Sequence, residues 1–321
     1  MKKIIANGFV GLMTLCGLLQ FLLLPGLVWN IAFPFIQILI LIFAFKNYRN
    51  SRFLKVISIF LIFLFLAEIC FSIYSKLNTR SSGVTTEIKV MTYNFFFENR
   101  IHNQSIMNIN KANPDILFVQ ELTPKSALAL ERKLENGFQY KMVNPLKGTH
   151  GIGIFSKHKL GSQKLVNNSA HKPYAQIVET KIEGKKIQLI NTHLASPAIA
   201  VENRDNFFSL FTQNYQLRKK QIAELNKLAE SNDHKYDCQL LVGDLNTLHS
   251  EPIFKRLKFK WTNSNNGLLR WMKFNFPNTS KLFPFVTLDY IMGRGQVKFK
   301  KSEVIDGAGS DHHAIMATIK L

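Results

Sequence analysis

The chain has 321 residues, of which 41 are Lys or Arg and 21 are Asp or Glu, so its formal net charge is +20. This excess of cations favours partners that carry negative charge, such as nucleic acid or an anionic lipid surface, although a solvated basic surface is an equally open explanation. Of the three cysteines, Cys16 and Cys70 lie in long apolar runs near the start of the chain, and only Cys238 lies beyond them, so the rest of the chain has no possible internal disulfide. No spacing of the cysteines suggests a zinc site.

The first apolar stretch contains no charged residue from Ile4 to Phe45. A membrane-spanning helix needs about 20 apolar residues, so this stretch is long enough for two spans, with Pro25 and Gly26 at the break between them. A third apolar run, Val56 to Tyr74, contains one charge. A cleaved signal peptide is shorter than this, and buried core helices would show a polar face. The sequence therefore predicts an anchor of three transmembrane helices in residues 1–75.

The cations around these runs predict an orientation. Lys2 and Lys3 precede the first run, and four more cations separate the second run from the third, namely Lys46, Arg49, Arg52 and Lys55. Because cytoplasmic loops are enriched in Lys and Arg, both groups are expected in the cytoplasm. Lys76 and Arg80 oppose this assignment but are outnumbered. We therefore expect a multi-pass protein of the cell (inner) membrane, with the rest of the chain extracytoplasmic, in the periplasm of a Gram-negative cell.

Residues 76–86 are polar and predict a short linker, and residues 87–321 are enough for one large domain. Strand-like runs occur at Lys89–Tyr93, Ile116–Val119, Ile152–Phe155, Ile177–Thr180, Ile187–Asn191, Gln239–Val242, Leu288–Met292 and Ala314–Leu321. Helical patterns occur at Gln104–Ala112, Lys125–Asn136 and Asn203–Ala229. Strands that alternate with helices indicate an α/β fold, and a hairpin turning at Glu183-Gly184 indicates mixed strand directions.

Four short polar clusters follow strand-like runs in this domain. They are Gln120-Glu121, Asn191-Thr192-His193, Gly243-Asp244-Leu245-Asn246 and Ser310-Asp311-His312. A strand that ends in a carboxylate, amide or imidazole delivers that group to the rim of a sheet, where α/β folds bind ligands. Any one such cluster is more often a turn or a helix cap. Four together predict a hard-metal site beside acid–base groups, which is the chemistry of phosphate-ester hydrolysis.

A phosphodiester repels hydroxide, so its hydrolysis requires a cation, an oriented water and a proton donor. Glu121 is the natural ligand for Mg²⁺, and Mn²⁺ is expected to substitute because the clusters offer oxygen donors without thiolates. Asp244 and Asn246 alternate at a strand end and are expected to hold a water together, with Gly243 allowing a sharp turn before them. His193 and His312 are expected to flank the phosphoryl oxygens.

The series of motifs resembles the endonuclease/exonuclease/phosphatase superfamily, which includes deoxyribonuclease I, AP endonucleases and neutral sphingomyelinases. Further matches are Asn94 in Met91-Thr92-Tyr93-Asn94, the run Gly151-Ile152-Gly153-Ile154-Phe155-Ser156, and Asp289 in Leu288-Asp289-Tyr290-Ile291. The resemblance covers Glu87 to Leu321, with the motifs in the family's order. The start of the domain further resembles a bacterial branch with transmembrane helices ahead of it. Ala314 stands where many members have a packing proline, which does not imply inactivity.

The resemblance implies a four-layer α/β sandwich, in which two packed mixed β-sheets are flanked by helices. It also implies that Asn94 and Asp311 complete or adjoin the metal site, and that Asp244 orients or deprotonates the nucleophile. Asp289 becomes the expected buried partner of one catalytic histidine, with Asp311 as a second carboxylate beside His312.

These observations favour a membrane-anchored, divalent-metal-dependent phosphoric ester hydrolase, a nuclease-type phosphodiesterase acting outside the cytoplasm. Its expected partners are the lipid bilayer, through three transmembrane helices, and a phosphodiester substrate; no protein partner is inferred. One alternative is a phospholipase C or sphingomyelinase-like enzyme, and another is a non-catalytic membrane scaffold. The segment 268–285 interleaves aromatic and basic residues, which suits nucleobases, a lipid interface or a packed loop.

Overall fold

The described part of the chain forms two mixed β-sheets covered by helices. In a computed structural model of the protein, the described residues are 86–135, 137–197, 204–249, 251–258, 260–265, 273–279 and 284–321. No helix within them is both long and apolar enough to cross a membrane. The three predicted spans in residues 1–75 lie outside the described residues, as do all of the linker except Thr86 and parts of segment 268–285, Trp271 and Phe283 included.

Each sheet has six strands, and each has one parallel pair at its centre. Sheet A is ordered β11 (Lys298–Ile305), β12 (Ala314–Lys320), β1 (Glu87–Asn94), β2 (Ile116–Gln120), β4 (Ile152–Ser156) and β3 (Tyr140–Asn144). Sheet B is ordered β5 (Leu160–Asn167), β6 (Pro173–Ile182), β7 (Lys185–His193), β8 (Cys238–Asp244), β10 (Asp289–Gly295) and β9 (Thr262–Asn263). The pairs β1–β2 and β7–β8 are parallel, and every other neighbouring pair is antiparallel.

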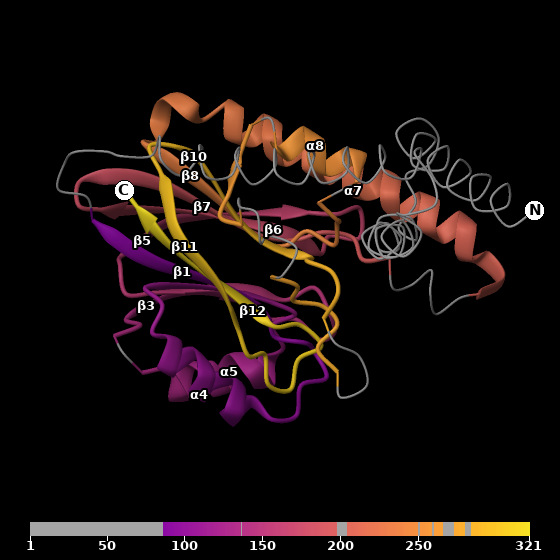
Figure 1. Ribbon diagram of the computed structural model, residues 1–321, viewed down its shortest axis with the longest axis horizontal. Helices are drawn as coiled ribbons and strands as arrows, with labels where there is room; N and C mark the ends of the chain where they lie inside the picture. Colours follow the sequence, from indigo (N-terminus) through magenta and orange to yellow (C-terminus); the bar gives the residue numbers. More distant parts are fainter. Residues whose placement is uncertain are drawn as a thin grey trace, which may run out of the picture. The chain divides into compact units, whose positions relative to one another are not determined.

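The helices cover the outer faces of the two sheets. Helices α4 (His102–Ala112) and α5 (Pro124–Lys133) lie against sheet A, while α7 (Phe207–Glu230) and α8 (Pro252–Lys258) lie against sheet B (Figure 1). Short 3₁₀ turns occur at Arg204–Asn206 and Asp233–Lys235. A central apolar cluster fills the space between the sheets, and one further cluster lies under the helices of each side. The predicted α/β sandwich is therefore confirmed.

The strands that the sequence pattern failed to predict are the edges of the sheets. They are β3, β5, β9 and β11, which occupy both ends of both strand orders. Their side chains are largely exposed and often charged, as in the Lys-Phe-Lys-Lys start of β11. An edge strand touches the core on less of its surface, and lysines on it discourage pairing with other chains. The apolar periodicity that reveals a central strand is therefore weak at an edge.

The three predicted helices differ from α4, α5 and α7 only at their ends, whereas α8 was not predicted. Helix α5 starts at Pro124, where the Thr123 side chain accepts a hydrogen bond from Ser126 N (3.1 Å), and it ends three residues before the predicted end at Asn136. Helix α7 begins at Phe207, four residues after the predicted start at Asn203. The hairpin between β6 and β7 turns at Glu183 and Gly184, which both have positive φ as a two-residue turn requires.

Candidate active site

Both sheets change from apolar to polar at one shared end. Side chains alternate along a strand, so the residue two positions beyond a core side chain points into the same space between the sheets. In β8 the inward residues Leu240 and Val242 lie in the central core, and Asp244 is the next in that series. In β10 the inward Ile291 is likewise preceded by Asp289. The site is the polar continuation of the inter-sheet core.

Asn94, at the end of β1, links carboxylates from both sheets. Its Nδ2 donates to Glu121 Oε1 (3.2 Å) and to Asp244 Oδ2 (3.1 Å), while its Oδ1 accepts from Phe96 N (3.1 Å). Phe97 N donates to Glu121 Oε2 (3.1 Å). Phe96 and Glu121 both adopt positive φ, at 57° and 54°. Left-handed backbone is unfavourable for such residues, and it concentrates at functional sites.

His193, the last residue of β7, faces the same two carboxylates. Its Nε2 lies 3.8 Å from Glu121 Oε1 and 3.6 Å from Asp244 Oδ2. On the other side of the ring, Nδ1 lies 3.0 Å from the Thr149 carbonyl oxygen, which can only accept. Nδ1 therefore carries the proton in the neutral ring, and Nε2 is the nitrogen directed at the carboxylates.

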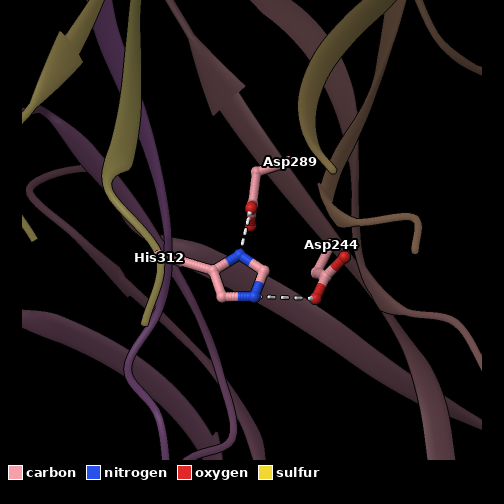
Figure 2. A group of neighbouring side chains, drawn as sticks. All are labelled: Asp244, Asp289 and His312. Carbon is pink, nitrogen blue, oxygen red and sulfur yellow. Dashed lines mark hydrogen bonds and ion pairs between the residues drawn. The ribbon is translucent and has the colours of Figure 1, made fainter. Parts of the chain in front are cut away.

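His312 is held between two buried carboxylates of sheet B, as Figure 2 shows. Its Nδ1 lies 2.6 Å from Asp289 Oδ2, and its Nε2 lies 3.9 Å from Asp244 Oδ2. Burial alone lowers the pKa of His312, but the charges of Asp289, Asp244 and Asp311, with the hydrogen bond to Asp289, overcome it and raise the pKa to about 10. His312 is therefore a buried cation at neutral pH.

Asp244 is the most central carboxylate of the site and is almost fully buried. Its Oδ1 accepts from Asn246 N (2.8 Å), and its Oδ2 accepts from Asn94. Burial raises the pKa of Asp244 to about 6, helped by the charge of Asp289 and opposed by His312 and His193. A carboxylate with a pKa near neutrality is suited to accepting a proton and releasing it again.

Asp311 and Glu121 are suited to holding a divalent cation. Burial raises the pKa of Asp311, and the charge of Glu121 adds to this, so the two carboxylates are close enough to repel. Asp311 Oδ1 is buried and has no hydrogen-bond partner among the described residues. A buried carboxylate oxygen without a partner is costly, and an oxygen-preferring cation would satisfy it. Asn94, whose Nδ2 donates to Glu121 Oε1, orients the Glu121 carboxylate.

Asp244, Asp289 and His312 form a second group whose ligand atoms all lie within 4.8 Å of one another. The contact of Asp289 with His312 Nδ1 has the length of a charge-assisted hydrogen bond, and the raised pKa keeps the imidazole protonated. A protonated imidazole cannot bind a metal. The all-oxygen pair Glu121 and Asp311 therefore fits Mg²⁺ better than this group does.

Two residues of the predicted clusters lie behind the site, where they join the sheets. Gln120 Nε2 donates to Asn191 Oδ1 (2.7 Å), and Asn191 Nδ2 donates to the carbonyl oxygens of Val119 (3.1 Å) and Gly153 (3.0 Å). All of these groups are buried. The clusters after β2 and β7 thus each contain one residue that faces the site and one that fixes the distance between the sheets.

Asn246 and Gly243 are placed differently from the prediction. Strand β8 ends at Asp244, and Asn246 adopts positive φ (46°), so it does not continue the alternation. Its Nδ2 donates to the Leu194 carbonyl (3.0 Å) while its N–H holds Asp244, which makes it a support for that carboxylate. Gly243 makes no turn, because it lies within β8. A Cβ there would come 2.0 Å from Thr192 O, so the close approach of β7 and β8 requires glycine.

Asn275 was not predicted, although it supports the Asp289–His312 pair. It is fully buried, and its Nδ2 donates to Asp289 Oδ2 and to the His313 carbonyl (3.0 Å). Its Oδ1 accepts from Leu288 N (3.0 Å). The next residue, Phe276, packs its ring 4.8 Å from that of His312. Asn275 lies in an irregular segment, so no strand pattern marks it.

Ser310 closes the site from the other side. Its Oγ donates to the Asn94 carbonyl (2.7 Å) and accepts from His312 N (3.0 Å), which ties the end of β1 to the loop before β12. Beside it, Asp311, Phe96 and Asn278 line an open pocket of about 600 Å³. The site thus combines carboxylates, a buried cationic histidine and an adjoining pocket, and each predicted residue lies in it or directly supports it.

Residues 91–312 match the family model described as Endonuclease/Exonuclease/phosphatase family. No curated protein matches the chain significantly. Among solved structures, truncated Caenorhabditis elegans TDP2 is 20% identical with a TM-score of 0.55, over 73% of this chain and 98% of that one. D. rerio TDP2 complexed with single strand DNA product is 16% identical with a TM-score of 0.57, over 73% and 99%.

The endonuclease/exonuclease/phosphatase from Bacteroides vulgatus is 13% identical, with a TM-score of 0.57, and the match covers 74% of this chain and 99% of that one. At these identities the solved structures support the fold alone. Assignment to a family rests on the family model, which covers most of the chain.

Proposed function

The chain belongs to the endonuclease/exonuclease/phosphatase family, and from this premise we propose that it is a divalent-metal-dependent phosphodiesterase with nucleic acid as its substrate class. The observation that carries the proposal is the buried contact of Asp244 with His312 and His193 beside the Glu121–Asp311 pair. It supports the assignment of a proton acceptor, a cationic donor and a cation-binding pair to one rim of the sandwich.

Asp244 is the residue that we assign to the nucleophilic water. With a pKa near 6 it is ionised at neutral pH, and Asn94 and Asn246 fix both of its oxygens. A fixed, ionised carboxylate can orient a water and accept its proton as the water attacks phosphorus. Glu121, oriented by Asn94, and Asp311 would hold a divalent cation, which when bound neutralises charge on the phosphoryl oxygens.

His312 is the residue that we assign to the charge developing on the phosphate. Its protonated Nε2 faces the space beside Asp244, and Asp289 maintains its charge through Nδ1. A buried cation fixed in this way stabilises a negative oxygen more strongly than a solvated one. His193 Nε2 points into the same space from sheet B and offers a second contact to phosphate.

The substrate class and the location are further parts of the proposal. Residues 81–321 hold 33 of the 41 Lys and Arg and 20 of the 21 Asp and Glu, and this net charge of +13 favours a polyanion. One similar structure, of D. rerio TDP2, is described as holding a single strand DNA product. The apolar runs in residues 1–75 and their flanking cations support an anchor of three transmembrane helices with the catalytic domain extracytoplasmic. Such an anchor also keeps open the alternative substrate class, a phospholipid or sphingomyelin headgroup diester.

The proposal is tested with the purified full-length protein in detergent. It is assayed against DNA, RNA, phospholipid, sphingomyelin and bis(p-nitrophenyl) phosphate, in chelator and after addition of Mg²⁺ or Mn²⁺. We expect hydrolysis of nucleic acid that is lost in chelator and restored by either metal. Preferential release of a lipid headgroup would select the alternative, and full activity after exhaustive chelation would remove the metal from the mechanism.

Topology is tested separately with reporters. A reporter fused after Leu321 should indicate an extracytoplasmic location, and one inserted near Asn50 should indicate the cytoplasm. The reverse result would place the enzyme beside intracellular nucleic acid.

A further inference from the structure

A second pocket, outside the active site, is lined by basic side chains. It lies between α4 and α5, which run side by side on the outer face of sheet A (Figure 1), and has a volume of about 550 Å³. Arg100, Lys125, Arg132 and Lys133 line it, and none of its described lining residues is acidic. Glu131, the nearest acid on α5, forms an ion pair with Lys141 instead. The pocket therefore favours a negatively charged occupant.

Most of these cations are not neutralised by the residues that the structure describes. Lys133 Nζ donates to Asn103 Oδ1 (2.6 Å), whereas Arg100, Lys125 and Arg132 are exposed and form no hydrogen bond or ion pair with any described residue. Uncompensated like charges around one pocket repel each other, and an external anion relieves that repulsion.

Aliphatic side chains are exposed in the same place. Ile101 is 52% exposed and Leu128 is 46% exposed, and both line the pocket. Met107, 55% exposed, lies on α4 one turn beyond Asn103. On α5, Leu128 lies between Lys125 and Arg132 at helical spacing, so one face presents an apolar centre with cations at both ends. Cations flanking exposed aliphatic residues are the pattern of a surface that rests in a lipid interface.

The two helices that form the pocket begin at the end of sheet A that carries the active site. Helix α4 follows the loop after Asn94, and α5 follows Glu121 after two residues. Phe97, which is 38% exposed, donates its N–H to Glu121 and lies three residues before Arg100. A surface bound along the first turns of these helices would therefore lie on the Asn94 and Glu121 side of sheet A.

We infer that the surface formed by Arg100, Ile101, Lys125, Leu128, Arg132 and Lys133 docks on an anionic phospholipid bilayer. Phosphate headgroups would occupy the basic pocket, and the aliphatic residues would enter the interface. A nucleic-acid backbone would satisfy the cations but offers nothing apolar to Ile101 and Leu128, which favours lipid. The inference uses the proposed anchor only as the reason that a bilayer is at hand, since linker residues 76–86 reach at most about 40 Å.

Lysine footprinting of the full-length protein tests this surface. The protein is reconstituted in nanodiscs of phosphatidylcholine alone or mixed with phosphatidylglycerol, and acetylation of each lysine is followed by mass spectrometry. We expect Lys125 and Lys133 to be acetylated severalfold more slowly in the anionic nanodiscs. Lys181 and Lys186 are exposed on the β6–β7 hairpin, at the opposite end of sheet B from His193, and serve as internal controls whose rates should not change.

Two matched variants of equal charge change separate docking from general electrostatics. The double variant Lys125→Glu, Arg132→Glu should remove the protection of Lys133 from acetylation by anionic nanodiscs. The control double variant Lys181→Glu, Lys186→Glu should preserve that protection. A third variant, Ile101→Ser with Leu128→Ser, should reduce protection without changing charge. All of these positions are exposed, so folding and the hydrolysis of a small soluble phosphodiester should be unaffected in each.

Two outcomes would overturn the inference. One is equal acetylation of Lys125 and Lys133 in neutral and anionic nanodiscs. The other is protection by a single-stranded oligonucleotide, added in chelator, without protection by anionic lipid. Failure of the proposed anchor is distinguishable, because the protein would then not co-purify with neutral nanodiscs. Footprinting in that case uses vesicles of the same two compositions, and hydrolysis assays on the same samples report on the catalytic proposal independently.

Discussion

The two sheets have the same arrangement of strands but contribute different chemistry to the site. Sheet A delivers Asn94 and Glu121 from its parallel pair, and Asp311 from the loop before β12. Sheet B delivers His193 and Asp244 from its parallel pair, and Asp289 from the antiparallel strand beside them. Sheet A therefore supplies the groups suited to a cation, and sheet B supplies most of the groups that govern protons.

The carboxylates of the two sheets also differ in how deeply they are buried. Asp244 and Asp289 of sheet B are each 1% exposed, whereas Glu121 is 9% exposed and Asp311 lines an open pocket. A buried carboxylate has a strong effect on its neighbours because little solvent screens its charge. His312, which arrives from sheet A, obtains its charge from sheet B across the interface. The same rim can thus hold a cation with one set of carboxylates and set the pKa of His312 with another.

The largest effect is expected from Asp244→Asn, which removes the proton acceptor. We predict a loss of kcat of about 10³-fold, since general acid–base groups contribute about 10²–10⁴-fold. The amide has the same shape, so the thermal unfolding midpoint and circular dichroism should remain close to those of the parent. Added Mg²⁺ should not rescue the variant. Near-parental turnover in the folded variant would refute the role of Asp244.

Glu121→Gln tests whether sheet A supplies the cation site, and its loss of activity should be the next largest. Loss of a charged ligand should weaken the site for its cation, and we expect activity at limiting Mg²⁺ to fall about 10²-fold. In contrast with Asp244→Asn, part of this activity should return as Mg²⁺ is raised, which a metal titration of kcat/KM would measure. If both variants respond to Mg²⁺ in the same way, the division of roles between the sheets is wrong.

Asp289→Asn tests whether sheet B controls the charge of His312. In the parent, activity should rise as Asp244 ionises near pH 6 and fall as His312 loses its proton near pH 10. The substitution removes the charge that raises the pKa of His312 most, while burial, which lowers it, remains. The alkaline limb of the pH–kcat/KM profile should therefore move to lower pH, with the acid limb moving less. An unchanged alkaline limb would show that His312 does not depend on Asp289.

Asn275→Ala should have the smallest effect on catalysis and a clear one on stability. It leaves the Leu288 N–H and the His313 carbonyl without their partner in a buried place, which costs about 1–3 kcal/mol. Loss of the Asn275 hydrogen bond would also leave the Asp289 carboxylate less firmly positioned against His312, and we expect kcat to fall about tenfold. Urea unfolding measures the first effect. The matched control is Asn278→Ala, which removes half-buried loop hydrogen bonds without touching Asp289 and should cost less.

Whether an element or a site residue can be predicted from the sequence depends on whether it belongs to a regular pattern of apolar and polar residues. The central strands carry apolar runs that end in polar clusters, and these runs predicted the strand ends at which the structure has Glu121, His193 and Asp244. The edge strands carry no such signal, because their exposed lysines obscure the period of two. Helix ends shifted by a few residues because capping, not periodicity, decides them.

The supporting residues were the hardest to predict. Asn275 approaches Asp289 from an irregular segment, and only the tertiary fold brings the two together. Gln120 and Asn191 stand beside the proposed site residues Glu121 and His193 in sequence but join the two sheets behind the site. Adjacent side chains of a strand point to opposite faces of the sheet, so neighbouring residues of one motif can have different roles. Sequence patterns marked the clusters, and the register of the strands decided which member of each faces the site.

The hydrogen bond from Ser310 to the Asn94 carbonyl joins residues 216 positions apart, and β12 pairs along nearly the whole length of β1. A ribosome adding about 5–20 residues per second would need on the order of 10–40 s to make the second partner after the first. Throughout that time the nascent chain lacks His312, and the edge of β1 that later receives β12 stays unpaired. The site therefore stays incomplete while the chain is being made, and in the same interval an unpaired strand edge is exposed to pairing with other chains.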